Sequence, residues 1–286
     1  MISHGQPHPI QHSPVSEHAH RKGWRPLFTF FFSTLGISLI LSLFATPCFG
    51  LSWWKTFRRC VSIGAGASLW LLIRKREKRS LRSYGFFDSR AGRRQFTFGV
   101  LLGLGGLGLL FILGVVSGTC RIDITPNQWR LWRTVIGFAP AAVLVGVLEE
   151  LVFRGYILQH LLSRSKILAV LISSALYAAV HVKVLAVTAS AGLELVGLFL
   201  LGIVLCLSYL LTHQLYLAVG LHAVLAYGAR VNKLIVELPN AYASVAWFVG
   251  TSRIINGMAS WILLLGMAGA IIWWTRAQRG VAYEKS

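Results

Sequence analysis

Eight long apolar stretches, separated by short segments that hold most of the charge, constrain this sequence more than any other feature. A helix needs about 20 mostly apolar residues to cross a hydrocarbon core, and it pairs its own backbone polar groups on the way. We therefore predict an all-α fold, a polytopic transmembrane helical bundle of about eight spans. The predicted spans are residues 27–46, 57–73, 96–117, 134–160, 167–189, 193–211, 215–231 and 254–274.

The composition agrees with a membrane protein. Of 286 residues, 55% are hydrophobic and only 13% are charged, about half the roughly 25% charged share of a soluble domain. The formal net charge of +19 would suit a nucleic-acid-binding protein, but Lys and Arg gather between the apolar runs rather than on one amphipathic face. This pattern is typical of loops that face an anionic leaflet. The predicted partner is the lipid bilayer, and nucleic acid is not expected.

The loop of residues 74–95 sets the predicted orientation. Between Arg74 and Arg94 it holds nine basic residues against Glu77 and Asp88, and short cytoplasmic loops are enriched in Lys and Arg. The protein is thus expected to be integral to a plasma or inner membrane, with this loop and both termini in the cytoplasm. Three basic residues do not follow the rule and are expected outside: Lys55, Arg58 and Arg59.

The first 26 residues are rich in His and Pro, and residues 4, 8, 12, 18 and 20 are histidines. A metal-binding tail is one interpretation. Prolines at positions 7, 9 and 14 prevent a helix from holding three of these histidines on one face, so we favour a disordered cytoplasmic tail.

Glu149 and Glu150 are unusual because they follow the apolar run 138–148 directly. A carboxylate at bilayer depth costs about 2.5 to 3.5 kcal/mol on insertion scales, so two neighbouring ones indicate a structural or chemical role. Arg154 stands four residues after Glu150, on the same helix face and within pairing reach. Glu149 is turned about 100° away and is left to point elsewhere. A general base is one role that suits it.

His181 and His222 are the two histidines that fall in the middle of predicted spans. Taken singly, each is more typical of a hydrogen bond between helices than of a ligand. Together with Glu149 they form the donor set of a hydrolytic metal centre, or a glutamate base with two histidines that steady an oxyanion. No HExxH zinc motif, GxSG serine motif or pair of intramembrane aspartates is present. The four cysteines have no metal-ligand spacing and are expected to be buried or lipid-facing.

The run Glu149-Glu150-Leu151-Val152-Phe153-Arg154 resembles the EExxxR motif of the CPBP family, which includes type II CAAX prenyl endopeptidases and bacteriocin-immunity proteins. The segment from Tyr177 to His181 is similar to the family's FxxxH motif, with Tyr in place of Phe. The segment from His222 to Ala226 is similar to its HxxxN motif. Here Ala226 replaces the asparagine and offers no hydrogen-bonding side chain, and Tyr227 and Asn232 are the nearest substitutes along the chain.

The resemblance implies an intramembrane endopeptidase that cleaves a membrane-associated protein or peptide. It implies that Glu149 activates water, that Glu150 and Arg154 support it, and that His181 and His222 complete the site. It permits a metal-free glutamate mechanism or a zinc ion held by the first carboxylate and the two histidines. It also permits a non-catalytic protein that binds a membrane partner or confers immunity. A third hypothesis, from the glutamates alone, is a proton-coupled carrier.

The chain is accordingly divided into four parts. Residues 1–26 form the tail, and residues 27–130 form the N-terminal transmembrane helices with the basic loop. Residues 131–231 form the CPBP-like core, and residues 232–286 form the last transmembrane helix and a basic cytoplasmic tail.

Reporter fusions test the predicted orientation. An enzyme tag that is active only after export should be inactive when fused within residues 74–95, because moving that many cations across the membrane is strongly disfavoured. An active fusion at this position would reverse the orientation.

Overall fold

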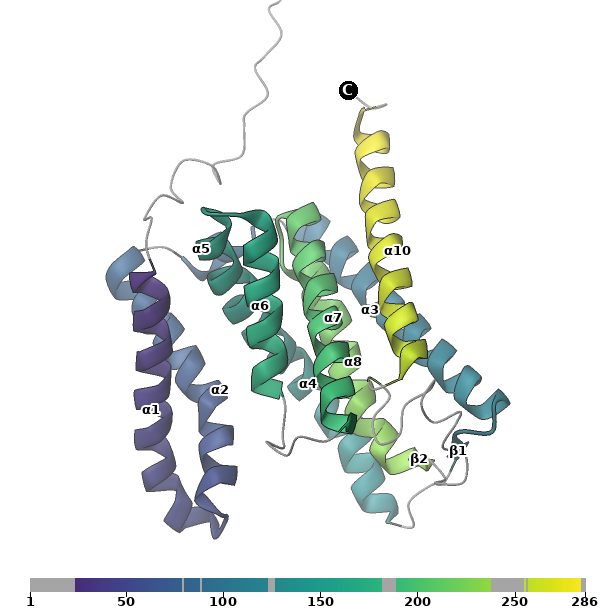
Figure 1. Ribbon diagram of the computed structural model, residues 1–286, viewed down its shortest axis with the longest axis horizontal. Coiled ribbons are helices and arrows are strands. Elements are labelled where there is room, and N and C mark those ends of the chain that lie inside the picture. Colours follow the sequence, from purple (N-terminus) through teal and green to yellow (C-terminus); the bar gives the residue numbers. More distant parts are fainter. Residues whose placement is uncertain are drawn as a thin grey trace, which may run out of the picture.

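The computed structural model describes residues 24–78, 80–87, 89–122, 127–181, 189–237, 255 and 257–283. The predicted disordered tail lies almost wholly outside these residues. The described chain folds into a helical bundle (Figure 1). Its elements are α1 (Arg25–Phe49), α2 (Trp53–Leu72), the π-helix η1 (Ile73–Glu77), the 3-10 helix η2 (Leu81–Tyr84), α3 (Ser89–Val116), β1 (Arg121–Ile122), α4 (Gln128–Glu150), the π-helix η3 (Leu151–Leu158), α5 (Gln159–Leu162), α6 (Lys166–His181), α7 (Ala189–Thr212), α8 (Tyr216–Ile235), β2 (Val236–Glu237) and α10 (Met258–Tyr283).

The predicted all-α membrane bundle is confirmed, since each predicted span overlaps a helix. Within the described residues, five helices are long and apolar enough to cross a membrane: Arg25–Phe49, Arg90–Val116, Gln128–Leu162, Ala191–Thr212 and Met258–Gly280. The other three predicted spans correspond to α2, α6 and α8. Helix α2 carries three cations in its first turns, α6 has only 16 residues, and α8 has two cations near its end.

One predicted span is longer than its helix. Residues 167–189 were expected to form a single helix, but α6 ends at His181, and residues 182–188 lie outside the described part of the chain. His181 is the last residue of α6 as described, and the predicted continuation of this span past His181 stays a prediction.

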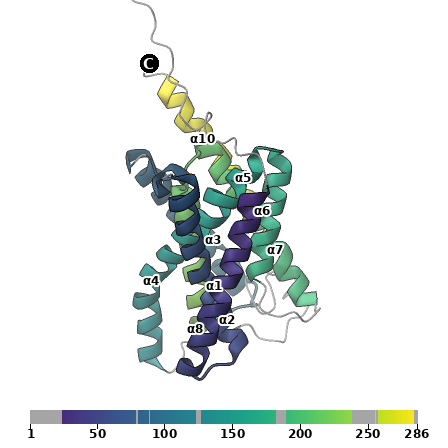
Figure 2. The same cartoon turned by 90° about the vertical axis from the view of Figure 1, so that its left-hand side faces the viewer.

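Helix α8 lies at the centre of the packing, where it contacts α3, α4 and α7. Helices α3 and α8 approach closely through two glycines. A side-chain carbon at Gly99 would collide with the carbonyl oxygen of Leu217, and one at Gly220 would collide with that of Phe96. Helices α1 and α2 form a hairpin at one edge of the bundle (Figures 1 and 2). This packing holds α8 and α4 side by side, which matters for the site.

The basic loop is folded against the helices that carry the predicted site. Glu77 accepts a hydrogen bond from the Tyr84 hydroxyl, and its other oxygen lies 3.2 Å from His160 Nε2. The Gln159 side chain donates to the Tyr84 carbonyl oxygen at 3.0 Å. Gly85 has a φ of 133°, a conformation that favours glycine, and its carbonyl accepts from the Leu215 backbone just before α8.

A two-residue antiparallel pairing at the opposite end was not predicted. Strand β1 pairs with β2, with Arg121 opposite Glu237 and Ile122 opposite Val236. It ties the segment after α3 to the end of α8. Two-residue strands have no periodic signal that sequence reading can detect.

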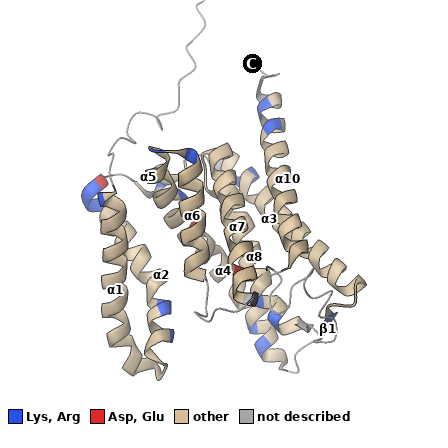
Figure 3. Cartoon of the chain, in the orientation of Figure 1, with Lys and Arg blue, Asp and Glu red and all other residues tan. Residues whose placement is uncertain are grey.

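The charged residues lie mainly toward the ends of the helices (Figure 3). The end that holds the start of α1 also carries η1, the turn between α5 and α6, and the last turns of α10 (Figure 1). Lys55, Arg58 and Arg59 lie in the first turns of α2, toward the other end.

Candidate active site in the helical core

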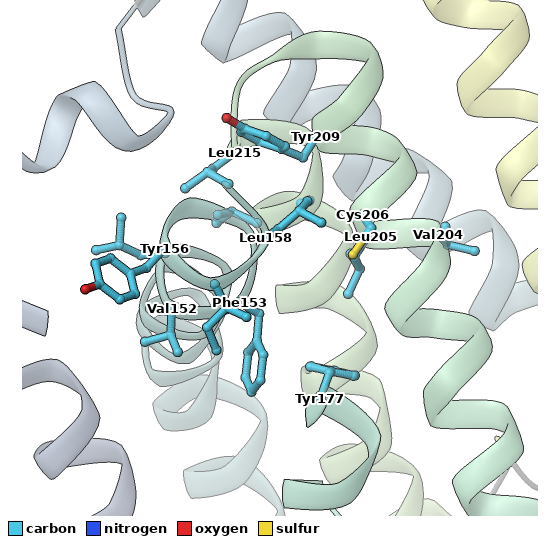
Figure 4. Packing of buried hydrophobic residues seen from close by; sticks show 14 of the residues in the cluster. Val152, Phe153, Tyr156, Leu158, Tyr177, Val204, Leu205, Cys206, Tyr209 and Leu215 are labelled. Carbon is cyan, nitrogen blue, oxygen red and sulfur yellow. The ribbon is translucent and has the colours of Figure 1, made fainter. Parts of the chain in front are cut away.

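The two neighbouring glutamates are the last residues of α4, and the chain then continues as the π-helix η3. Short π-helical segments occur frequently at functional sites because the wider turn redirects side chains. All eight residues of η3 are buried, and a core of apolar side chains from α6 and α7 surrounds it (Figure 4). Glu149 lies about 20 Å along the helix axis from Leu162, so the site is deep within the long span Gln128–Leu162.

Glu150 and Arg154 form a fully buried ion pair. Arg154 Nη1 lies 3.0 Å from Glu150 Oε1, and both side chains have no exposed surface. Arg154 Nη2 donates to the carbonyl oxygen of Gly202 in α7 at 3.1 Å. The pairing predicted from the four-residue spacing is therefore present, and it also ties η3 to α7.

His222 is held by the same carboxylate. Its Nδ1 lies 2.7 Å from Glu150 Oε1, and the side chain is 4% exposed. A carboxylate accepts hydrogen bonds, so Nδ1 carries the proton and the neutral ring presents a lone pair at Nε2. Glu150 thus fixes both the orientation and the tautomer of His222.

Tyr177 packs between the predicted site residues. Its ring lies 4.7 Å from the Arg154 guanidinium carbon and 5.8 Å from the His222 ring, centroid to centroid. Its carbonyl oxygen lies 2.8 Å from His181 Nδ1. A carbonyl also accepts, so His181 has its proton at Nδ1 and a lone pair at Nε2 in the neutral form. The aromatic residue one turn before His181 therefore sets that ring as well as filling the core.

Glu149 is where the two histidines meet. Its Oε2 lies 3.2 Å from His181 Nε2 and 3.6 Å from His222 Nε2. The side chains of Glu149 and His181 are 24% and 28% exposed, whereas those of Glu150 and Arg154 are fully buried. The structure therefore brings all five predicted site residues together, and it leaves one side of the cluster open.

The contacts around Glu149 Oε2 bring acceptor atoms together. Both neutral imidazoles present lone pairs at Nε2, and a carboxylate oxygen is also an acceptor. Among the described residues, Glu149 Oε2 is buried and has no hydrogen-bond partner. A proton on one ring or a bound cation relieves such a convergence, since either supplies the missing positive charge.

The donor chemistry suits zinc, which takes imidazole nitrogen and carboxylate oxygen at about 2.0 to 2.2 Å. A tetrahedral site with such bonds has ligand separations of about 3.4 Å, close to the two separations from Glu149 Oε2, 3.2 and 3.6 Å. Within the described residues, however, no group of three or more His, Cys, Asp or Glu is arranged to hold a metal ion. The three side chains therefore match a zinc site in the type of donor atom and in these two interatomic distances.

Neither predicted substitute for the missing asparagine is seen to serve the site. The Tyr227 hydroxyl donates to the carbonyl oxygen of Val135 in α4 at 2.9 Å. Asn232 lies five residues further along α8 than Tyr227. Sequence reading missed Gly202, whose carbonyl accepts from Arg154. The sequence does not single it out, because α7 holds further small residues such as Gly192 and Gly197.

Residues 130–227 match the family model of the Rce1-like type II CAAX prenyl endopeptidases. Comparisons with curated proteins and with solved structures give no match. The matched segment contains both glutamates, Arg154 and both histidines of the site. Over residues 130–227, this integral membrane protein is therefore similar to the Rce1-like type II CAAX prenyl endopeptidases.

Proposed function

We propose that the protein is an intramembrane endopeptidase that hydrolyses a peptide bond of a membrane-associated protein with a water molecule activated by Glu149. The observation that carries this proposal is the position of Glu149 Oε2, within 3.2 and 3.6 Å of two histidine nitrogens from two other helices. A water molecule held among these three atoms has a base beside it and a ring nitrogen on each side.

In the proposed reaction, Glu149 takes a proton from water while the water oxygen attacks the carbonyl carbon of the peptide bond. The carbon–nitrogen bond then breaks, and the leaving nitrogen receives the proton from Glu149. A histidine protonated at Nε2 donates a hydrogen bond to the oxyanion. Glu150 and Arg154 touch neither water nor substrate in this scheme; they hold His222 in place.

The surroundings of the open side support a substrate from the membrane. Apolar residues that neighbour Glu149 and His181 along the chain are exposed: Leu144 is 60%, Val145 is 36%, and Val180 is 54% exposed. Such residues suit contact with lipid or with an apolar segment. We therefore propose that the substrate is held at the membrane by a lipid anchor or a transmembrane segment and approaches from this side.

A second candidate is a non-catalytic protein of the same fold that binds a membrane partner. Ala226 favours it, because the family's asparagine position has no hydrogen-bonding side chain and the Tyr227 hydroxyl is already bonded to Val135. In that case the buried cluster serves packing alone.

Glu149→Gln separates the two candidates. The amide has nearly the same shape but cannot take up a proton, so cleavage of a membrane substrate should fall by at least about 100-fold with unchanged folding. Glu237→Gln, in strand β2 and about 20 Å further along α8 from His222, is the matched control and should cleave normally. Full cleavage by Glu149→Gln at equal protein level would contradict the protease proposal.

Arg154→Ala tests the supporting pair. Removing one partner leaves the other charge buried and uncompensated, which typically costs about 3 to 5 kcal/mol. The variant should show a lowered melting temperature in detergent, whereas Arg93→Ala, at an exposed position in α3, should melt like the native protein. The double variant Glu150→Gln/Arg154→Met should recover part of the loss, because neither charge remains. Equal melting of Arg154→Ala and Arg93→Ala would show that the ion pair is not structural.

Zinc held by Glu149, His181 and His222 stays a prediction. When bound, such an ion polarises a carbonyl and lowers the pKa of its water. The zinc hypothesis expects cleavage to stop in a chelator and to return with zinc, together with about one zinc per native chain and none per His181→Ala/His222→Ala chain. Unchanged cleavage after metal removal would contradict it and favour the glutamate mechanism.

A further inference from the structure

A cleft of about 190 Å³ opens between α3, α7 and α10, apart from the glutamate and histidine cluster. It far exceeds the roughly 10 to 15 Å³ that one water molecule requires, so it can admit a ligand of several atoms. Its walls come from the first turns of α3, the end of α7 and the last turns of α10. These segments lie at the end of the bundle that holds η1 and the start of α1 (Figure 1).

Two guanidinium groups line the cleft, and no acidic residue does. They belong to Arg94 on α3 and Arg279 on α10. Arg279 donates one hydrogen bond, to the Leu211 carbonyl oxygen at 3.1 Å, which leaves most of its five N–H donors for a ligand. Within the described part of the chain, neither arginine forms an ion pair. Paired guanidinium groups without a carboxylate are typical of phosphate recognition.

The neighbourhood is electropositive beyond the two arginines. His213, in the turn after α7, has its pKa lowered from the usual value, mainly by burial and further by the positive charges of Arg279 and Lys166. Helix α10 adds one further cation, Arg276, on the outer turns that are blue in Figure 3.

The cleft also offers an acceptor and an apolar wall. Gln95 is 7% exposed, and its Oε1 has no hydrogen-bond partner among the described residues. A ligand with a hydroxyl or ammonium group can satisfy that oxygen. The Trp274 ring, which also lines the cleft, stacks on Phe98 with centroids 4.6 Å apart, and Trp is enriched at membrane interfaces. The two cations, the unpartnered acceptor and the apolar wall of the cleft together complement a phospholipid headgroup, which carries an anionic phosphate, hydroxyl groups and a glycerol backbone.

We propose that this cleft binds a phosphate-bearing anion through Arg94 and Arg279, and that the anion is the headgroup of an anionic phospholipid. The phosphate oxygens accept from the two guanidinium groups, a headgroup hydroxyl donates to Gln95, and the glycerol lies along Trp274. The site is independent of the proposed peptide hydrolysis, and it ties α3 and α10 together beside the end of α7.

The probes are phosphatidylglycerol, phosphatidylcholine and inorganic phosphate, and binding to the purified full chain is followed by native mass spectrometry and by thermal shift. The native protein should retain phosphatidylglycerol more strongly than phosphatidylcholine. Arg94→Gln/Arg279→Gln should weaken phosphatidylglycerol binding by at least about tenfold, because two charge-assisted hydrogen bonds are lost. The matched control is Arg93→Gln/Arg276→Gln, which removes equal charge from the same two helices outside the cleft, and its affinity should stay within about twofold of native.

The outcomes identify the source of the phosphate. If inorganic phosphate alone stabilises the protein and competes with the lipid, with the same dependence on Arg94 and Arg279, the cleft is a phosphate site filled by the free anion. If phosphatidylglycerol stabilises the protein in a way that depends on Arg94 and Arg279, and inorganic phosphate does not, the ligand is the lipid headgroup. Equal losses in both double variants, or no loss in either, would overturn the proposal. Should the cleft double variant not fold, Arg279→Gln against Arg276→Gln makes the same comparison.

Discussion

Arg154 and Glu150 lie deep in an apolar bundle with no exposed side-chain surface, and the site depends on their pairing. Neither charge is stable alone at that depth, because the desolvation cost of an isolated ion is several kcal/mol. Paired, the two opposite charges compensate each other, and each group keeps one further hydrogen bond to a neighbouring helix. One guanidinium nitrogen reaches the Gly202 carbonyl, and the shared carboxylate oxygen accepts from His222 Nδ1.

The consequence is a division of labour between adjacent glutamates. Glu150 has a structural role, because it pairs with Arg154 and accepts a hydrogen bond from His222. The chain continues as a π-helix directly after it. Glu149 is partly exposed and lies opposite the free nitrogens of two histidines. This arrangement supports the proposed role of Glu149 as the base, since its carboxylate is accessible while that of Glu150 is held by Arg154 and His222. The Nδ1 atoms of His222 and His181 each face a hydrogen-bond acceptor, the Glu150 carboxylate and the Tyr177 carbonyl oxygen, so each neutral ring carries its proton on Nδ1.

Much of this could be predicted from the sequence, for physical reasons. Apolar runs such as those of α1 and α7 can only be helices in a bilayer, and the four-residue spacing of Glu150 and Arg154 already placed them in contact. The convergence of His181 and His222 could only be inferred from the resemblance, because contacts between helices have no local signal. The end of α6 at His181, the Gly202 carbonyl and the use of the Tyr227 hydroxyl by Val135 depend on packing alone.

The tautomer of His222 tests the account most directly. Nitrogen-15 spectra of histidine-labelled protein in membranes distinguish the protonated from the unprotonated ring nitrogen, and the His222→Gln variant identifies the signals by their loss. The His222 ring should carry its proton on Nδ1, and that signal should change when Glu150 is replaced by Gln, since the ring then loses its carboxylate partner. A neutral ring with its proton on Nε2, or a signal indifferent to Glu150, would contradict the claim that the buried pair orients the site.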